Sequence, residues 1–180
     1  MIEPFEGDWP QIDDTAFVHP SAVIIGRVRI GAHCSIWPNA VLRGDDAEIV
    51  IGPRTNIQDG VVVHTTENLS RVVVGARVTV GHMALLHGCI IGDDCLIGMG
   101  SVLLDNAVVE SNAYIGAASL VTQRKKIPSG VLALGNPARV VRSLTQKDLD
   151  WIQYSWKRYV ANAETFKRAR AEDDGGYKAS

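Results

Sequence analysis

The stretch IGDDCLIGMGSVLLDNAVVESNAYIGAASLV, residues 91–121, decides the fold, because it repeats every six residues. Branched apolar residues stand at positions 91, 97, 103, 109, 115 and 121, and glycine follows three of them. This period is neither that of an amphipathic helix nor the two-residue alternation of an ordinary strand. Repetition at a fixed short period is instead typical of a solenoid.

The same period runs through most of the chain. Seventeen lead positions carry Val, Ile or Leu: Val18, Ile24, Ile30, Ile36, Leu42, Ile51, Ile57, Val63, Val74, Val80, Leu86, Ile91, Ile97, Leu103, Val109, Ile115 and Val121. Gaps of nine, eleven and five residues interrupt the series. The fifth residue of a hexad is usually small, as at Ala40, Cys95 and Ser101.

These features predict an all-β fold, a parallel β-helix of triangular section. Each hexad then forms one short strand and one corner, with the lead and fifth residues pointing toward the axis. Three hexads complete a coil, and successive coils pair as parallel strands about 4.8 Å apart. Cys34 and Cys95 occupy fifth positions, so we expect both to fill the core.

The places where the repeat starts and stops divide the chain into four segments. We expect an N-terminal segment over residues 1–17, the repeat over 18–126, a return segment over 127–144 and a helix over 145–172. Thr145, with Asp148 three residues later, resembles a capping box. Apolar residues at helical spacing follow, among them Ile152, Trp156 and Tyr159. A C-terminal α-helix laid along the β-helix is therefore expected.

The composition argues against several classes of protein. Lys and Arg total 18 and Asp and Glu total 20, a net charge of −2, so we expect no surface for nucleic acid. No stretch approaches the ~18 apolar residues of a membrane span, and no signal peptide is visible. The three cysteines form no CxxC pair, which favours reduced thiols in a cytoplasmic protein.

The repeat also decides which histidines are neighbours. His64 and His87 each directly follow a lead residue, three hexads apart, so they are expected to stack one coil apart. Arg43 continues their column one coil earlier. His82 is the third residue of its hexad and belongs to another face, where Asp59 is the matching residue one coil earlier.

A stacked pair of histidines suits a metal ion. Zinc in catalytic sites takes three protein ligands and leaves one position open. His64 and His87 supply two ligands, and His82 of a neighbouring copy is the simplest third. The spacing thus predicts metal sites at the interfaces of a symmetric oligomer, and three-fold closure suits a triangular prism.

Five motifs in this order resemble the γ-class carbonic anhydrase family. They are RGDD (43–46), NIQDG (56–60), His64, GHMALLHGC (81–89) and IGMGS (97–101), and the similarity covers about residues 12–165. The resemblance implies a left-handed β-helix, although right-handed crossovers are the general rule. It also implies a homotrimer that hydrates CO2 reversibly to bicarbonate, with zinc (Zn2+), or alternatively Fe2+ or Co2+, between subunits. The ligands would be His64 and His87 of one chain and His82 of the next.

The resemblance carries further roles onto single residues. Arg43 and Asp59 match an ion pair between subunits, and Asp45 would help to fix that interface. Gln58 matches the residue that hydrogen-bonds the metal-bound water or hydroxide. Tyr159 matches a tyrosine that reaches the metal site from the C-terminal helix.

Two acidic residues are candidates for proton transfer. Glu67 stands three residues after His64, the spacing of the family's proton-shuttle glutamate, and Asp46 stands where the active prototype has a glutamate. The loop TTENLSR (65–71) is short where the prototype has a long acidic insertion. Asn162 stands one place away from the position of a family asparagine.

Two other functions stay open at this point. A hexapeptide acyltransferase or a CoA-thioester hydrolase would use the same coil, with His87 as a general base rather than a metal ligand. The chain could also be a non-catalytic, metal-stabilised trimeric scaffold, and the short loop favours that interpretation. Metal content tests the first alternative, and turnover by the metal-loaded protein tests the second.

Overall fold

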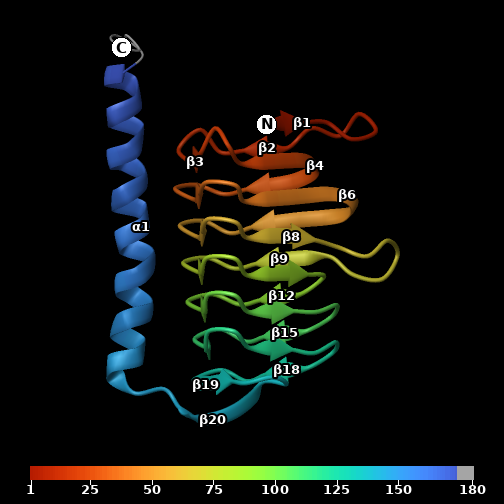
Figure 1. Cartoon of the computed structure of the whole chain (residues 1–180), viewed down its shortest axis with the longest axis vertical. Coiled ribbons are helices and arrows are strands. Elements are labelled where there is room, and N and C mark those ends of the chain that lie inside the picture. The colour runs from red at the N-terminus through yellow and green to blue at the C-terminus, as the bar shows by residue number, and fades with distance from the viewer. Residues whose placement is uncertain (174–180) are drawn as a thin grey trace.

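The computed structural model describes residues 1–173 and shows a left-handed parallel β-helix with a long helix along its side, which confirms the predicted fold class (Figure 1). The larger sheet contains β1 (Ile2–Glu3), β2 (Gln11–Ile12), β4 (Val23–Ile30), β6 (Val41–Ile51), β8 (Val62–His64), β9 (Val72–Val74), β11 (Leu85–His87), β12 (Ile90–Ile91), β14 (Val102–Leu103), β15 (Val108–Val109), β17 (Leu120–Val121) and β18 (Lys126–Ile127). The smaller sheet contains β3 (Phe17–Val18), β5 (Ser35–Ile36), β7 (Asn56–Ile57), β10 (Thr79–Val80), β13 (Leu96–Ile97), β16 (Tyr114–Ile115), β19 (Val131–Leu134) and β20 (Arg139–Ser143). The helix α1 spans Gln146–Asp173.

The coils form three faces. The first face has the strand order β17-β14-β11-β8-β6, the second β6-β9-β12-β15-β18, and the smaller sheet is the third. β6 belongs to the first two faces, because its residues 41–42 pair with β8 and its residues 49–51 pair with β9. It therefore turns a corner near Gly44 without a break in the strand. One coil later this corner is the loop of residues 65–71, which protrudes between β8 and β9 in Figure 1.

The hexad pattern describes the core. Sixteen of the seventeen lead side chains are buried, and Val18 is half-buried. Each branched side chain of this kind contributes about 1.5–3 kcal/mol when it leaves water. Cys34 and Cys95 are free thiols inside the core, where burial raises the pKa of Cys34 to about 11 and that of Cys95 to about 12. Both are therefore core fillers, as their hexad position predicts.

Strand pairing extends beyond the lead positions at both ends of the solenoid. Ile2–Glu3 and Gln11–Ile12 both pair with β4. Past the last predicted lead position, Ile127 and Ala133 are fully buried on the axis. Ile127 and Ala133 follow Val121 at the same six-residue spacing, and their strands β18 and β19 pair in parallel with β15 and β16. The solenoid therefore extends past residue 126, the predicted end of the repeat.

The helix α1 begins at the last coil and ends beside the first (Figure 1). The capping box is present, because the Thr145 backbone N–H donates to Asp148 Oδ2 at 2.7 Å and the Asp148 N–H donates to Thr145 Oγ1 at 3.3 Å. Trp37 of the coil packs edge-on against Tyr159 and Phe166, with ring centroids 5.3 Å apart in both pairs. Within residues 1–173, no helix is long and apolar enough to cross a membrane.

Candidate metal centre

The predicted site residues fall into two groups at two corners of the triangular coil. The His64–His87 cluster lies where the first and second faces meet and comprises Asp45, Asp46, His64, His87 and Asp105. The His82 cluster lies beside α1 and comprises Gln58, Asp59, His82 and Tyr159. Each group is described in turn.

His64 and His87 stack as the column count predicts. They are register partners at the ends of β8 and β11, with ring centroids 5.3 Å apart. His64 Nδ1 and His87 Nε2 face each other at 3.3 Å. The side chains are 15% and 27% exposed, so both rings are largely sheltered from water.

The other nitrogen of each ring faces a carboxylate. His64 Nε2 lies 3.1 Å from Asp45 Oδ1, and His87 Nδ1 lies 3.2 Å from Asp105 Oδ1. An ionised carboxylate can only accept hydrogen bonds. Each ring nitrogen that faces one is therefore placed to donate an N–H to it.

Both carboxylates are held in the ionised form. Burial alone would raise the pKa of each, but the hydrogen bond from Arg43 lowers the pKa of Asp45, and the hydrogen bond from Ser70 lowers the pKa of Asp105. The net pKa of each carboxyl lies below its usual value. Both are therefore acceptors at neutral pH.

This arrangement leaves two lone pairs pointing at one another. A neutral imidazole has a single N–H, and when each ring directs it to its carboxylate, His64 Nδ1 and His87 Nε2 are both left as acceptors. Zinc–nitrogen bonds of about 2.0–2.1 Å place neighbouring tetrahedral ligands roughly 3.3 Å apart, and the two nitrogens are separated by 3.3 Å. The donor set therefore fits a zinc-like cation, and Fe2+ and Co2+ also accept imidazole ligands.

Asp46 brings a second carboxylate to His64, with Oδ2 at 3.5 Å from Nε2. Within residues 1–173, ligand atoms of Asp45, Asp46 and His64 form a group within 4.8 Å of one another, and His82 is outside it.

Arg43 forms an ion pair with Asp45 of the same chain. An Arg43 contact with Asp59 is not formed within one chain and stays a prediction for the contact between chains.

His82 lies beside Asp59, the residue predicted to match it one coil earlier. Its Nδ1 lies 3.0 Å from Asp59 Oδ2. The backbone N–H of His82 donates to Gln58 Oε1 at 3.2 Å, and Gln58 Nε2 donates to Asn56 Oδ1 at 3.1 Å. The buried Gln58 amide is thereby fixed, with one of its two Nε2 hydrogens left over. The His82 side chain is 41% exposed, and its Nε2 is the ring nitrogen that does not face Asp59.

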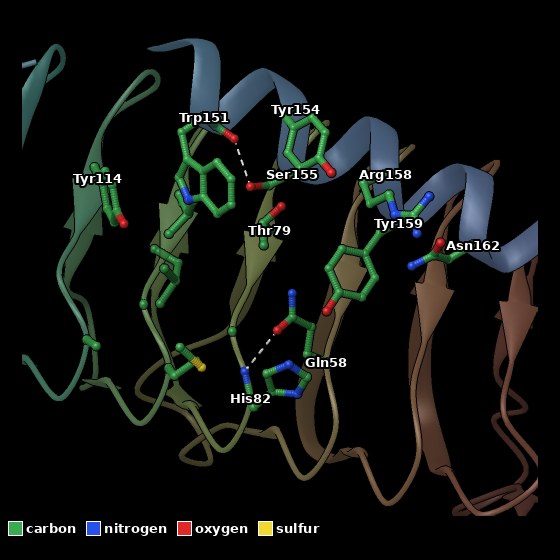
Figure 2. A pocket seen from close by; sticks show the side chains of 16 residues that line it. Gln58, Thr79, His82, Tyr114, Trp151, Tyr154, Ser155, Arg158, Tyr159 and Asn162 are labelled. Carbon is green, nitrogen blue, oxygen red and sulfur yellow. Dashed lines mark hydrogen bonds between the residues drawn. The ribbon is translucent and has the colours of Figure 1, made fainter. Parts of the chain in front are cut away.

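A groove of about 370 Å³ lies between α1 and the coil beside His82 (Figure 2). Figure 2 shows Gln58 and His82 rising from the coil and Tyr159 reaching toward them from α1. Burial, followed by the nearby Asp59 carboxylate, raises the pKa of Tyr159. Its hydroxyl therefore stays protonated and can donate a hydrogen bond.

Glu67 belongs to neither cluster by contact. It is exposed in the loop of residues 65–71, which protrudes on the side of the coil opposite α1 (Figure 1). The foot of this loop does reach the His64–His87 cluster, because Thr66 and Ser70 donate hydrogen bonds to Asp105. One chain thus places Asp46 and Glu67 on the His64 side, and Gln58 and Tyr159 on the His82 side.

Sequence reasoning missed one residue at these corners. Asp105 is the acceptor for His87, and its signal is Gly88, which holds the same hexad position one coil earlier and leaves space for a polar side chain. Asn162, which stands one place away from the position of a family asparagine, also lines the groove, one helical turn after Tyr159.

The coil, its hexads and its stacked histidines define a hexapeptide-repeat protein of the left-handed β-helix class. The family Bacterial transferase hexapeptide (six repeats) matches residues 10–44 and 88–123. The chain is 43% identical to protein YrdA of Escherichia coli strain K12, over 89% of this chain and 90% of that protein. It is 47% identical to the mitochondrial gamma carbonic anhydrase 2 of Arabidopsis thaliana, over 86% of this chain. The chain belongs to the γ-class carbonic anhydrase family.

The relatives differ in length and in the activities their names give them. The match spans 58% of the length of the Arabidopsis protein. A crystal structure of a Bacillus cereus protein, described as a candidate acetyltransferase, has a TM-score of 0.91 and 41% identity, over 93% of this chain and 97% of that one. Family membership therefore leaves the reaction to be argued from the site.

Proposed function

We propose that the chain is a metal-dependent carbonic anhydrase-like enzyme that hydrates CO2 reversibly to bicarbonate. The observation that carries the proposal is the pair of facing ring nitrogens, His64 Nδ1 and His87 Nε2, which lie 3.3 Å apart while the other nitrogen of each ring faces a carboxylate. Zn2+ is the proposed metal, with Fe2+ or Co2+ as alternatives.

In this proposal His82 of a second copy supplies the third ligand. His82 stands at another corner of its own chain, with its Nε2 available. A homotrimer joins these corners pairwise around a three-sided prism. Arg43 and Asp59, whose side chains are 45% and 46% exposed, would then pair across the interface beside Asp45.

The neighbouring side chains then have defined tasks. A divalent metal held by neutral imidazoles supplies the positive charge that lets water ionise near neutral pH. Three carboxylates hold the three rings in orientation: Asp45 for His64, Asp59 for His82 and Asp105 for His87. The remaining Nε2 hydrogen of Gln58 orients the attacking water, and the Tyr159 hydroxyl is a second donor for oxygen atoms of the substrate or product.

Proton removal is assigned to the carboxylates of the His64 side. Asp46 is 36% exposed and lies 3.5 Å from His64 Nε2, so it can accept a proton near the site and face solvent. Glu67 is exposed on the adjacent loop, where it can pass the proton to buffer. The three buried free thiols suit a reducing cytoplasm, which we propose as the compartment.

Metal content and oligomeric state, measured together, test the proposal. We expect wild type to purify as a trimer with about one metal ion per chain, and His82→Ala to lose metal and trimer stability together. Stopped-flow CO2 hydration by zinc-loaded and anaerobic iron-loaded protein tests the activity. Full metal occupancy without turnover would instead support the scaffold.

A second candidate function rests on the groove beside His82. Its volume of about 370 Å³ and its lining by Tyr114, Trp151 and Tyr154 suit an apolar acyl or pantetheine chain better than CO2. The Bacillus cereus relative bears an acyl-transfer name. Titration of metal-free protein with CoA and acetyl-CoA tests this candidate: saturable binding lost in Trp151→Ala supports acyl chemistry, and absence of binding removes it.

A further inference from the structure

We propose that Asp105 is a positioning residue for His87: it fixes the imidazole as the Nδ1–H form, so that the Nε2 lone pair points at His64. The inference rests on the proposed metal site, since it concerns which nitrogen is offered to the ion. It does not depend on CO2 being the substrate.

The Asp105 carboxylate is placed by three donors. Its side chain is 10% exposed, and Oδ1 lies 3.2 Å from His87 Nδ1. The same oxygen accepts hydrogen bonds from Ser70 Oγ at 2.6 Å and from Thr66 Oγ1 at 3.2 Å. A carboxylate held by two hydroxyl donors has little freedom to leave the imidazole.

Gly88 is what lets the carboxylate reach this place. A Cβ on Gly88 would lie 2.2 Å from Asp105 Oδ1 and 2.1 Å from Ser70 Oγ. The Asp105 side chain therefore occupies space that any other residue at position 88 would fill. In the motif "HG" at 87–88, His87 is thus the proposed metal ligand, and the next residue, Gly88, leaves room for the Asp105 carboxylate that faces it.

The consequence concerns the tautomer of His87. The neutral imidazole in water favours the Nε2–H form, which would put a hydrogen where the metal is to bind. An acceptor-only carboxylate at Nδ1 reverses that preference and makes Nε2 a better ligand. Partners of this kind change metal affinity by roughly 10–100-fold.

The same carboxylate links the ring to the loop that carries Glu67. The Thr66 backbone N–H donates to Ser70 Oγ at 3.1 Å, and Ser70 in turn donates to Asp105. Asn106, the next residue, donates from Nδ2 to the Leu69 carbonyl at 3.4 Å. Movement of the loop therefore changes the hydrogen bonding of the carboxylate that orients His87.

Asp105→Asn tests the inference, with Asp93→Asn as the matched control. Asp93 is also the third residue of its hexad, and its Oδ1 accepts the Ala76 backbone N–H at 2.8 Å, away from either histidine cluster. Zinc affinity is measured by competition with a chelator, and the His87 tautomer of metal-free protein by imidazole ¹⁵N NMR. We expect Asp105→Asn to lower zinc affinity roughly 10–100-fold and to shift His87 toward Nε2–H, while Asp93→Asn changes neither.

The outcomes separate this inference from the proposed activity. Unchanged affinity and tautomer in Asp105→Asn, or equal losses in both variants, would overturn it. The NMR readout needs no bound metal, so it decides the inference even if wild type proves inactive or metal-free. If Asp105→Asn does not fold, Ser70→Ala, which loosens the carboxylate but keeps it, should shift affinity and tautomer in the same direction by less; no shift there would overturn the inference.

Discussion

The two histidine corners of this chain differ in what each lacks. At the His64–His87 corner the rings are sheltered and each has its carboxylate, and the two remaining ring nitrogens face each other with no third histidine beside them among the described residues of the same chain. At the His82 corner one ring has its carboxylate, a fixed amide and a groove, and its other nitrogen is the unused one. The His64–His87 corner therefore offers two ligand atoms and the His82 corner offers one. A three-histidine site shared between two copies of the chain requires this division.

The largest expected effect comes from removing one ligand at each corner in separate chains. We expect His64→Ala and His82→Ala each to lower zinc affinity by more than the roughly 100-fold typical of outer partners. When the two variants are unfolded, mixed in equal amounts and refolded, random assortment gives about one quarter of interfaces an intact ligand set. Metal content after gel filtration measures this recovery.

Refolded single variants are the control for that experiment. Each alone should stay metal-free, since none of its interfaces carries all three histidines. Absence of recovery in the mixture, with trimers formed, would show that the two corners do not meet across an interface. Metal retained by His82→Ala alone would show that the His64–His87 corner is complete in itself.

Only the His82 corner is bordered by α1, and Trp37→Ala tests the packing that holds this helix against the coil. Trp37 is 6% exposed and packs edge-on against Tyr159 and Phe166, so it holds α1 beside the His82 corner. Loss of a buried Trp side chain is expected to lower the free energy of unfolding by about 3–5 kcal/mol. Trp9→Ala, at a position 62% exposed, is the matched control and should change it by about 0.5 kcal/mol or less. Urea unfolding followed by circular dichroism measures both, and equal effects would contradict the assignment.

The stacking at both corners could be predicted from the sequence because coil register follows from counting hexads. That count predicts the neighbours of His64 and of His82 despite the insertion between them. Asp105 could not be predicted in this way, because its reach to His87 depends on the space above Gly88 and on two hydroxyls from a loop without repeats. Helical spacing predicts that α1 lies along the coil, but the hexad count does not say where its side chains meet it, as Trp37 meets Tyr159 and Phe166.

A smaller effect is expected from adding one methyl group at the His64–His87 corner. Gly88 and Gly100 have similar positive φ angles, +63° and +67°, but a Cβ at Gly88 meets Asp105 and Ser70 while one at Gly100 meets nothing within 4 Å. Alanine at either position should lower the free energy of unfolding by roughly 1–2 kcal/mol from backbone strain. Only Gly88→Ala should also lower zinc affinity, by about tenfold, because it displaces the carboxylate from His87. Equal zinc affinities in the two variants would show that the space left by the missing Cβ of Gly88 is not needed for Asp105 to act on His87.

The smallest expected effect concerns the link between α1 and the coil. Asp94 accepts hydrogen bonds from Arg77 Nε at 2.8 Å and Nη2 at 2.6 Å, and from Gln153 Nε2 of α1 at 3.0 Å. The hydrogen bond from Arg77, against the opposing effect of burial, lowers the pKa of Asp94 below 3.8. Asp94 thus secures the helix that borders the His82 corner.

The sign of the pH dependence follows from that lowered pKa. A carboxyl that is more acidic in the folded chain stabilises it above the unfolded value of 3.8, and the contribution disappears as pH falls through the folded pKa. Asp94→Asn should therefore lower the free energy of unfolding by about 0.2–1 kcal/mol at pH 7. The difference between wild type and variant should shrink at pH 3, because Asp94 of the unfolded chain binds a proton there more readily than Asp94 of the folded chain. Urea unfolding of both proteins at pH 7, 4 and 3 measures this difference directly, and a difference that grows on acidification would contradict the lowered pKa of Asp94.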